Sequence, residues 1–484
     1  MSVNQQIRAI RVSSAIDFRQ ESFYNQSMII EIAPENGEKN LLELLRKKGY
    51  PVVAPCGGNG RCGGCKVFLN GQEVLACKTE IDDKCAVEIP ERSSIRSAPI
   101  TENKGQTEGE TYFAVDIGTT TVTAALCHGR NVVEATTFDN PQLTFGADVL
   151  SRIQNVKKAG VEALRRPLLS ALDSAMRALS EKRNVSPEKA YVCGNTVMLH
   201  LFWGEDPTPL GVAPYKPVFL NGREEKISEL NEITVVSLPC VSSYIGADIA
   251  AGIASCPLPK KDKLSLLIDL GTNAEIALVG AERILTASAA AGPCFEGGNI
   301  SCGMPATGGA VTAFSLEKRR VSFIGTKPLG LCGTGLIDVI GQLRKANIID
   351  ETGFLSFKQG YPIAPSVILT QDDVRQFQLA KSAVRSGIEV LLKEAKITCG
   401  DVEKVYLAGG VSTGISVENA VYAGLLPKEL APVCAPAKNS ALAGTVLYSY
   451  APEKIEKVIE KARYIDLAST PLFSEYFIKN IDFR

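Results

Sequence analysis

The alternation of apolar and polar positions divides the chain into two dissimilar parts. Between residues 28 and 90, the segment MIIEIAPENG predicts a strand and a turn, and KNLLELLRKKG predicts a short helix that ends at Gly49. The segment KVFLNGQEVL predicts a hairpin around Asn70-Gly71. From about residue 111, apolar strands run into glycine-rich turns, which favours an α/β architecture. Residues 91–110 are polar and show no apolar period, so we expect a flexible linker, whereas residues 1–27 have weak periodicity and predict no element.

Four of the fourteen cysteines lie within 22 residues of the first part, three of them in a loop with five glycines and the fourth in the strand-like segment VLACKT. They are Cys56, Cys62, Cys65 and Cys77, spaced C-x5-C-x2-C-x11-C. Sulfide ions of an iron–sulfur cluster require nearby N–H donors, which a glycine-rich backbone exposes well. The spacing is the plant-type [2Fe–2S] arrangement with one extra residue in the first gap. A structural zinc site is the alternative, but zinc ribbons prefer two C-x2-C knuckles and only one is present.

Two similar hairpins lie in the second part, each with a strand, an Asp, a Gly-Thr turn and a second strand. They are TYFAVDIGTTTVTAALCHG and LSLLIDLGTNAEIALVG. The glycine lets backbone N–H groups approach phosphate oxygens, the hydroxyls add donors, and the aspartate can face Mg²⁺ through water. The residues predicted to act in this way are Asp116, Gly118, Thr119, Thr120 and Thr121 in the first hairpin, and Asp269, Gly271, Thr272 and Asn273 in the second.

A third glycine turn lies near the C-terminus in VEKVYLAGGVSTGISVENA. Its strand ends at Gly409-Gly410, and Ser412 and Gly414 precede a helix that begins near Ser416. A glycine pair between strand and helix suits the close approach of a nucleotide base and ribose, so we expect an ATP site.

Hydrolysis of ATP also requires a carboxylate that orients the attacking water. Asp148 in FGADVLSR and Glu275 in NAEI are the candidates, although either could equally be a helix cap or a solvated strand residue. The Gly-, Ala- and Ser-rich stretch 286–310 is predicted to contact the nucleotide or a partner.

Composition narrows the class of function. Lys plus Arg (52) balances Asp plus Glu (53), which argues against a nucleic-acid partner. No run of about eighteen apolar residues and no signal peptide is visible, so we expect a cytoplasmic protein with no membrane span. Only two histidines are present, which leaves little room for imidazole chemistry.

An iron–sulfur module joined to this order of hairpins and glycine turn resembles the reductive activators of corrinoid proteins. The resemblance rests on CGGNGRCGGC, DIGTTTV, FGADVLSRI, CGNTVMLHLF, IDLGTNAEI, GPCFEGGNISCGM, CGTGLID and LAGGVSTG. It implies an α+β β-grasp ferredoxin domain (28–90) followed by a two-lobed, ribonuclease-H-like ATPase of the acetate and sugar kinase/Hsp70/actin superfamily. The lobes would span 111–260 and 261–450, the latter with a helix that returns to the first lobe, and 451–484 would form a C-terminal tail.

The same resemblance implies the activity. Such proteins use ATP and Mg²⁺, an upstream low-potential donor and their [2Fe–2S] cluster to return a corrinoid from Co(II) to Co(I). The partner would be a corrinoid protein of a methyltransferase system. Longer members carry a further small domain before the first hairpin, whereas here Asp116 follows the linker closely, so any dimerisation that this domain supplies is in doubt and a homodimer stays an open alternative.

Three other functions remain to be weighed. An activator of a radical enzyme would hold its cysteines inside the ATPase fold, and a redox-regulated small-molecule kinase would need a substrate-base aspartate that no motif identifies. A Hsp70-like binding protein would need a peptide-binding domain after the ATPase, for which about 35 residues beyond position 450 are too few.

Overall fold

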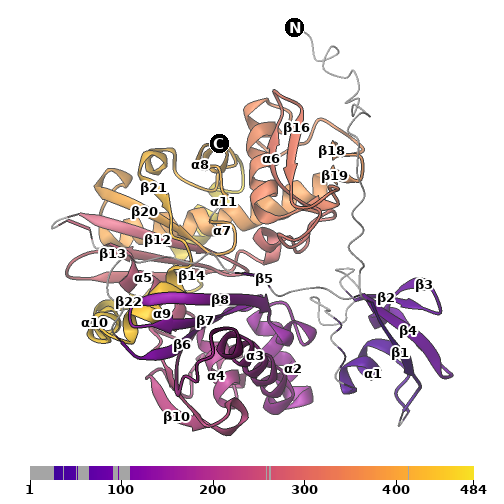
Figure 1. Ribbon diagram of the computed structural model, residues 1–484. Helices are drawn as coiled ribbons and strands as arrows, with labels where there is room; N and C mark the ends of the chain where they lie inside the picture. The colour runs from indigo at the N-terminus through magenta and orange to yellow at the C-terminus, as the bar shows by residue number, and fades with distance from the viewer. Residues whose placement is uncertain are drawn as a thin grey trace.

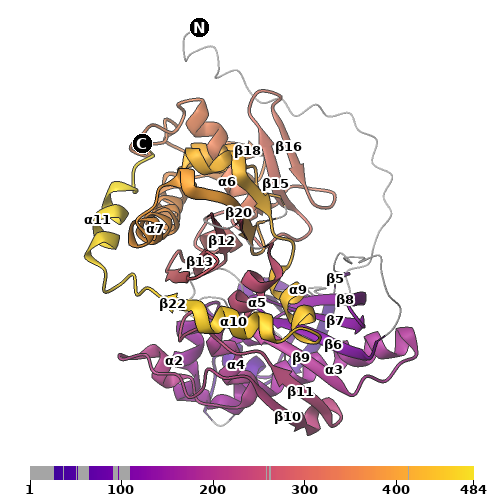
Figure 2. The same ribbon diagram turned by 90° about the vertical axis from the view of Figure 1, so that its left-hand side faces the viewer.

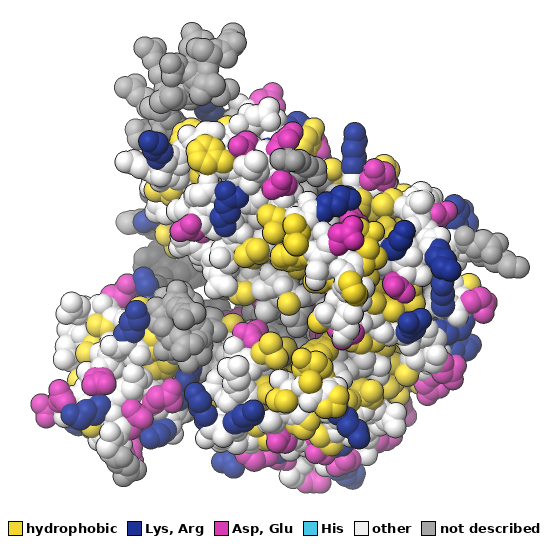
Figure 3. Space-filling view, turned by 180° about the vertical axis from the view of Figure 1, so that it is seen from behind, with side chains coloured by type: hydrophobic (Ala, Val, Ile, Leu, Met, Phe, Trp, Pro, Cys, Tyr) yellow, Lys and Arg dark blue, Asp and Glu magenta, His cyan; other side chains and the backbone are white. Residues whose placement is uncertain are grey.

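The computed structural model describes residues 27–35, 37–48, 50, 52, 65–90, 96–97, 109–257, 259–260, 263–412 and 414–483. These residues form a small N-terminal unit and two larger lobes, one above the other in Figure 1. Among them, no helix combines the length and apolar character needed to traverse a lipid bilayer. On the face shown in Figure 3, Lys and Arg side chains are interspersed with Asp and Glu, and neither sign forms a continuous field.

The N-terminal unit is a four-stranded antiparallel sheet in the order β1-β4-β2-β3, with one helix against it. The expected strand, helix and hairpin are confirmed. Asn40 caps the helix by accepting N–H groups of its first turn, and Asn70 and Gly71 take the positive φ that a tight hairpin requires. The elements are β1 (Ser27–Ile32), α1 (Leu41–Lys47), β2 (Lys66–Leu69), β3 (Gln72–Leu75) and β4 (Cys85–Pro90).

Part of the segment between the two predicted domains is ordered against the first lobe. Strand β5 (Arg96–Ser97) pairs with β8 (Asn131–Asp139), with Arg96 opposite Thr137. The expectation of a flexible linker over all of 91–110 therefore needs correction at these two residues, because backbone pairing at a sheet edge does not depend on an apolar side-chain period.

The first lobe is built on a seven-stranded sheet in the order β10-β11-β9-β6-β7-β8-β5. Strands β6, β7 and β8 form an antiparallel meander, whereas β9 is parallel to β6 and β11 is parallel to β9. Besides β5 and β8 the strands are β6 (Thr111–Ile117), β7 (Thr121–His128), β9 (Lys189–Gly194), β10 (Arg223–Ile227) and β11 (Ile233–Ser237). The helices are α2 (Val149–Ala159), α3 (Val161–Arg183), α4 (Thr196–Trp203) and α5 (Ala247–Ser255).

The second lobe repeats this arrangement. Its sheet has the order β21-β20-β12-β13-β14-β22, with an antiparallel β12-β13-β14 meander and parallel β20 and β21. The strands are β12 (Leu264–Leu270), β13 (Ala274–Val279), β14 (Ile284–Ala289), β20 (Val402–Ala408), β21 (Cys434–Pro436) and β22 (Ala462–Tyr464). The long helix is α7 (Gln371–Ala395), and the outer part of the lobe holds β15 (Ala310–Ser315), β16 (Arg320–Phe323), β17 (Gly330–Leu331), α6 (Gly333–Lys345), β18 (Tyr361–Ala364), β19 (Val367–Leu369) and α8 (Val417–Tyr422).

Helix α5 and a helix that follows the second lobe in the chain join the two lobes, and both helices lie between the lobes in Figure 2. Helix α9 (Ser440–Tyr448) follows the second lobe, yet its Leu442 and Val446 pack against Tyr112 and Ala114 of β6. It crosses α5 so closely that a Cβ at Gly444 would lie 2.0 Å from the Ala251 carbonyl oxygen. The glycine at this crossing lets the two helix backbones touch, so the crossing is one structural link between the two lobes.

The C-terminal residues return to the second lobe. After α10 (Glu453–Lys461), β22 adds a parallel strand beside β14, and α11 (Pro471–Lys479) packs along α7. Buried Lys381 of α7 donates to the carbonyl oxygens of Asn480 and Asp482, which holds the end of the chain against that helix.

Candidate active site

The first glycine hairpin, between β6 and β7, is held by asparagine side chains from two other segments. Asn140 donates to the Gly118 carbonyl oxygen at 2.8 Å, and its N–H donates to the carbonyl oxygen of Thr120 at 2.8 Å. Asn195, the N-cap of α4, donates to the Thr119 hydroxyl at 2.9 Å. The turn is therefore fixed from both sides.

The remaining predicted hairpin residues complete the two turns. A Cβ at Gly118 would lie 2.6 Å from the Thr121 carbonyl oxygen, so only glycine fits there. In the second hairpin, between β12 and β13, the Gly271 N–H donates to the Asn273 carbonyl oxygen at 3.1 Å.

One carboxylate joins the two hairpins across the lobes. Glu296 accepts the hydroxyl of Thr120 at 2.8 Å and also the hydroxyl of Thr272. It ends a short 3-10 turn, Pro293–Glu296, between Gly292 at φ 74° and Gly297 at φ 83°. The sequence predicted that stretch 286–310 contacts a ligand, but it did not single out Glu296; the glycines that flank the turn were the available signal.

Four further carboxylates near the hairpins interact electrostatically with one another, and two of them, Asp269 and Glu275, also interact with Glu296. Asp116 and Asp269 are the second-last residues of the first strands of the two hairpins, and Glu275 is paired with Asp269 in the β12–β13 register. Asp248 lies in the first turn of α5, where a Cβ on the preceding Gly246 would come within 2.7 Å of its Oδ1. Each carboxylate, including Glu296, retains partial solvent exposure. Asp248 was also missed from the sequence, although Gly-Ala-Asp occurs there as it does before α2.

These five carboxylates form what we call the carboxylate cluster, and repulsion among them disfavours ionisation of all five at once. Burial, reinforced by the charge of Asp248, raises the pKa of both Asp116 and Asp269 to about 7. Burial raises the pKa of Asp248 to about 6 and that of Glu275 well above its usual range. The pKa of Glu296 is raised by burial in the same way, but the hydroxyls of the two hairpins oppose this shift. A divalent cation would relieve the repulsion among these groups.

The two proposed catalytic carboxylates occupy different environments. Asp148 is the N-cap of α2 and accepts both the N–H of Ser151 at 2.8 Å and its hydroxyl at 2.6 Å. These bonds are those of the helix-cap alternative. Glu275 instead lies within the carboxylate cluster, beside Asp269.

The third glycine turn meets the second hairpin. Gly409 has φ 84°, and a Cβ there would lie 2.6 Å from Asp269 Oδ1, whereas a Cβ on Gly410 would meet nothing within 4 Å. Ser412 is buried and donates its N–H to the Gly409 carbonyl oxygen at 3.1 Å. A Cβ at Gly414 would approach Thr334 to 3.3 Å. The turn thus places Gly409 against Asp269, the aspartate predicted to face Mg²⁺, and leaves free space beside Gly410.

Two of the four predicted cluster cysteines lie together in the N-terminal unit. The sulfurs of Cys65 and Cys77 are 3.2 Å apart, and the Cys77 N–H donates to Cys65 Sγ at 3.5 Å. Cys56 and Cys62 lie outside the described residues. Within the described part of the chain, no three acidic, cysteine or histidine side chains form a group arranged to ligate a metal ion.

The paired lobes, the two hairpins and the connecting helices are those of an actin-like ATPase fold. Residues 263–484 match the family model described as the C-terminal, ASKHA domain of RACo, and residues 112–261 match the RACo middle region. The chain belongs to this family of reductive activators of corrinoid proteins.

Individual relatives agree with this assignment. The corrinoid activation enzyme RamQ of Eubacterium limosum is 31% identical over 420 residues, which cover 77% of this chain and 70% of RamQ. The [Co(II) methylated amine-specific corrinoid protein] reductase of Methanosarcina barkeri is 27% identical over 341 residues, covering 61% of this chain and 63% of that protein. A solved structure of a reductive activator for a corrinoid, iron–sulfur protein superposes with a TM-score of 0.70 at 24% identity and covers 92% of this chain and 95% of its own.

Proposed function

We propose that this protein is an ATP-dependent reductive activator, which delivers one low-potential electron to a corrinoid protein and returns its cobalt from Co(II) to Co(I). The observation that carries the proposal is that one chain combines a converging cysteine pair with two phosphate-type hairpins joined on Glu296. The names of its relatives supply the substrate class, since one is a corrinoid activation enzyme and another is a reductase of a Co(II) corrinoid protein.

The N-terminal unit would be a β-grasp ferredoxin domain with a [2Fe–2S] cluster on Cys56, Cys62, Cys65 and Cys77. The two described cysteines fit such a group, because their sulfurs converge and one of them accepts a backbone N–H. Bonds of this kind stabilise cluster thiolates and tune their potential. When bound, the cluster supplies one-electron transfer at low potential. Cys85 is directed elsewhere, toward the Ile32 carbonyl oxygen at 3.7 Å.

The lobes would bind ATP with Mg²⁺. Asp116 and Asp269 would hold Mg²⁺ through water, and the hydroxyls and N–H groups of the two hairpins would donate to the phosphates. Glu275 and Glu296 are the carboxylates best placed to orient the attacking water, because both belong to the cluster. Gly410 would admit the base or ribose.

The ATP requirement follows from the redox chemistry. Plant-type clusters lie near about −400 mV, and every ~59 mV uphill lowers a one-electron equilibrium tenfold. Transfer to a Co(II)/Co(I) couple more negative than the cluster therefore needs a second source of free energy. Hydrolysis of ATP to ADP and phosphate supplies it if the lobes hold different conformations with each nucleotide. We place this reaction in the cytoplasm, with an upstream low-potential donor and a methyltransferase-type corrinoid protein as partners.

The test begins with anaerobic protein reconstituted with iron and sulfide. Mixed with a Co(II) corrinoid protein, a strong reductant and Mg·ATP, it should produce the Co(I) absorption band, and no band should form without ATP. Asp269→Asn should keep its iron and sulfide but lose the ATP-dependent band, while Asp372→Asn, at an exposed position in α7, should behave as wild type. A protein that holds no iron, or that phosphorylates a small molecule and forms no Co(I), would refute the proposal.

A further inference from the structure

Among the described residues, Arg46 of α1 brings the N-terminal unit into contact with the first lobe. The Arg46 side chain is only 8% exposed and is paired with Glu43 at 2.7 Å. Its guanidinium donates to the carbonyl oxygen of Thr144 and lies over the Phe145 ring, 5.9 Å from the ring centre. A charge-assisted bond and a cation–π contact thus join the unit to the segment Asn140–Gly146 of lobe I.

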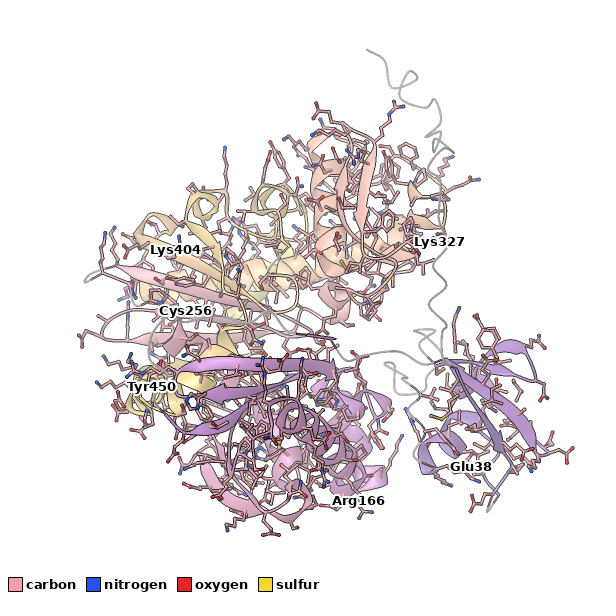
Figure 4. The ribbon with its side chains drawn as sticks, in the orientation of Figure 1. Glu38, Arg166, Cys256, Lys327, Lys404 and Tyr450 are labelled. Atoms are coloured by element: carbon pink, nitrogen blue, oxygen red, sulfur yellow. The ribbon has the colours of Figure 1, made fainter. Side chains whose placement is uncertain are left out.

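The length of the connection independently keeps the unit near this segment. Five residues separate Pro90, at the end of β4, from Arg96 of β5, and they span at most about 20 Å. Because β5 pairs with β8, and β8 runs directly into Asn140, the unit is anchored beside the segment that Arg46 contacts. In Figure 4 the unit that carries Glu38 lies on the same side of the molecule as Arg166 of lobe I.

A second arginine connects the segment Asn140–Gly146 with the first glycine hairpin. Arg152 of α2 is completely buried. Its Nε donates to the Gly146 carbonyl oxygen at 3.0 Å and its Nη1 to Gln142 Oε1 at 3.1 Å. Its Nη2 donates to the carbonyl oxygen of Thr119. One planar guanidinium therefore holds two residues of the segment that Arg46 touches, Gln142 and Gly146, and also the turn predicted to bind phosphate.

A phosphate bound at the first hairpin would act on the positive charge of Arg152. The charged groups that act on it are Asp148 and Glu296. Burial lowers its pKa to about 9, since its contacts are mainly uncharged carbonyl and amide oxygens. Phosphate at Thr119 would add negative charge on one side of the guanidinium and draw it away from Gln142 and Gly146.

We propose that the segment Asn140–Gly146 is the docking site of the N-terminal unit, and that Arg152 couples this docking to occupancy of the first hairpin. The inference rests on the proposed function and adds its regulation: Mg·ATP loosens the electron-carrying unit from lobe I. By linkage, the docked unit weakens nucleotide binding by the same factor. Arg152 is a positioning residue in this scheme, and Arg46 is the contact that it controls.

The experiment measures backbone hydrogen exchange in the reconstituted full chain, in peptides that cover 41–48 and 140–146. Arg46→Gln should speed exchange in both segments by about fivefold or more, as expected for a coupling in the usual range. Lys47→Gln is the matched control, because Lys47 is the next residue on the same helix and is exposed. Mg·ATP should accelerate exchange in both segments of the wild type, and Arg152→Lys should lose this response when it is measured at a nucleotide concentration that saturates the variant.

The outcomes separate the parts of the inference. Equal exchange in Arg46→Gln and Lys47→Gln would overturn the docking site. An Arg46 effect without any response to Mg·ATP, in protein that hydrolyses ATP, would overturn the coupling and leave the proposed function standing. If no nucleotide binds, the proposed function fails, while the comparison of Arg46 with Lys47 still decides the docking site.

Discussion

The two adjacent glycines of the third turn give a sharp test of the site's geometry. An alanine at Gly409 would have to adopt φ 84°, which costs an L-residue about 1–2 kcal/mol. Its Cβ would also lie 2.5 Å from the Leu270 carbonyl oxygen and 2.6 Å from Asp269 Oδ1. Overpacking against a fixed backbone costs roughly 1–3 kcal/mol more. We therefore expect Gly409→Ala to destabilise the second lobe by about 3 kcal/mol.

Thermal unfolding without nucleotide measures this cost. About 3 kcal/mol corresponds to a Tm decrease of roughly 6–12 °C for a unit of some 200 residues. Gly410→Ala is the control, because nothing lies within 4 Å of its Cβ and its φ is not in the left-handed range. It should shift stability by less than about 1 kcal/mol. ATP turnover should collapse in Gly409→Ala, because Asp269 must move. Equal Tm values for the two variants would show that the turn does not press on Asp269.

Three further predictions concern separate parts of the molecule. Glu296→Gln removes the charge, keeps an acceptor oxygen for only one of the two hairpin hydroxyls and places an NH2 donor against the other. ATP turnover should therefore fall at least about tenfold, and an unchanged kcat would show that Glu296 takes no part in hydrolysis. Cys65→Ser should lower bound iron and sulfide yet leave ATP hydrolysis intact, and full iron content would contradict its role as a ligand. Burial lowers the pKa of Lys381 to about 7, so between about pH 7 and 10 the unfolded chain binds more protons than the folded chain. Denaturant titrations should therefore show wild-type stability rising relative to Lys381→Met from pH 7 to 9, and a constant difference would refute the shift.

Local sequence predicted the elements whose geometry depends on neighbours in the chain. The positive φ of Asn70 and Gly71 and the helix capped by Asn40 follow from residues a few positions apart. The two Asp-x-Gly-Thr turns are of the same kind, because the glycine directly after each strand sets the turn locally. Asp148 illustrates the limit of such reasoning. The same tripeptide, Gly-Ala-Asp, contains a helix-capping aspartate at Asp148 and a member of the carboxylate cluster at Asp248.

Sequence alone thus determined that this chain holds two Asp-x-Gly-Thr hairpins, a third glycine turn and a group of closely spaced cysteines, since each of these features lies within a short run of residues. Only the tertiary structure decided what those parts meet. Glu296 lies 176 residues from Thr120, and its position depends on how the two lobes close. Arg152 reaches Thr119 and Gly146 only because α2 packs behind the hairpin. Contacts of this range carry no local signal, because the long intervening chain leaves their geometry to the packing of sheets and helices.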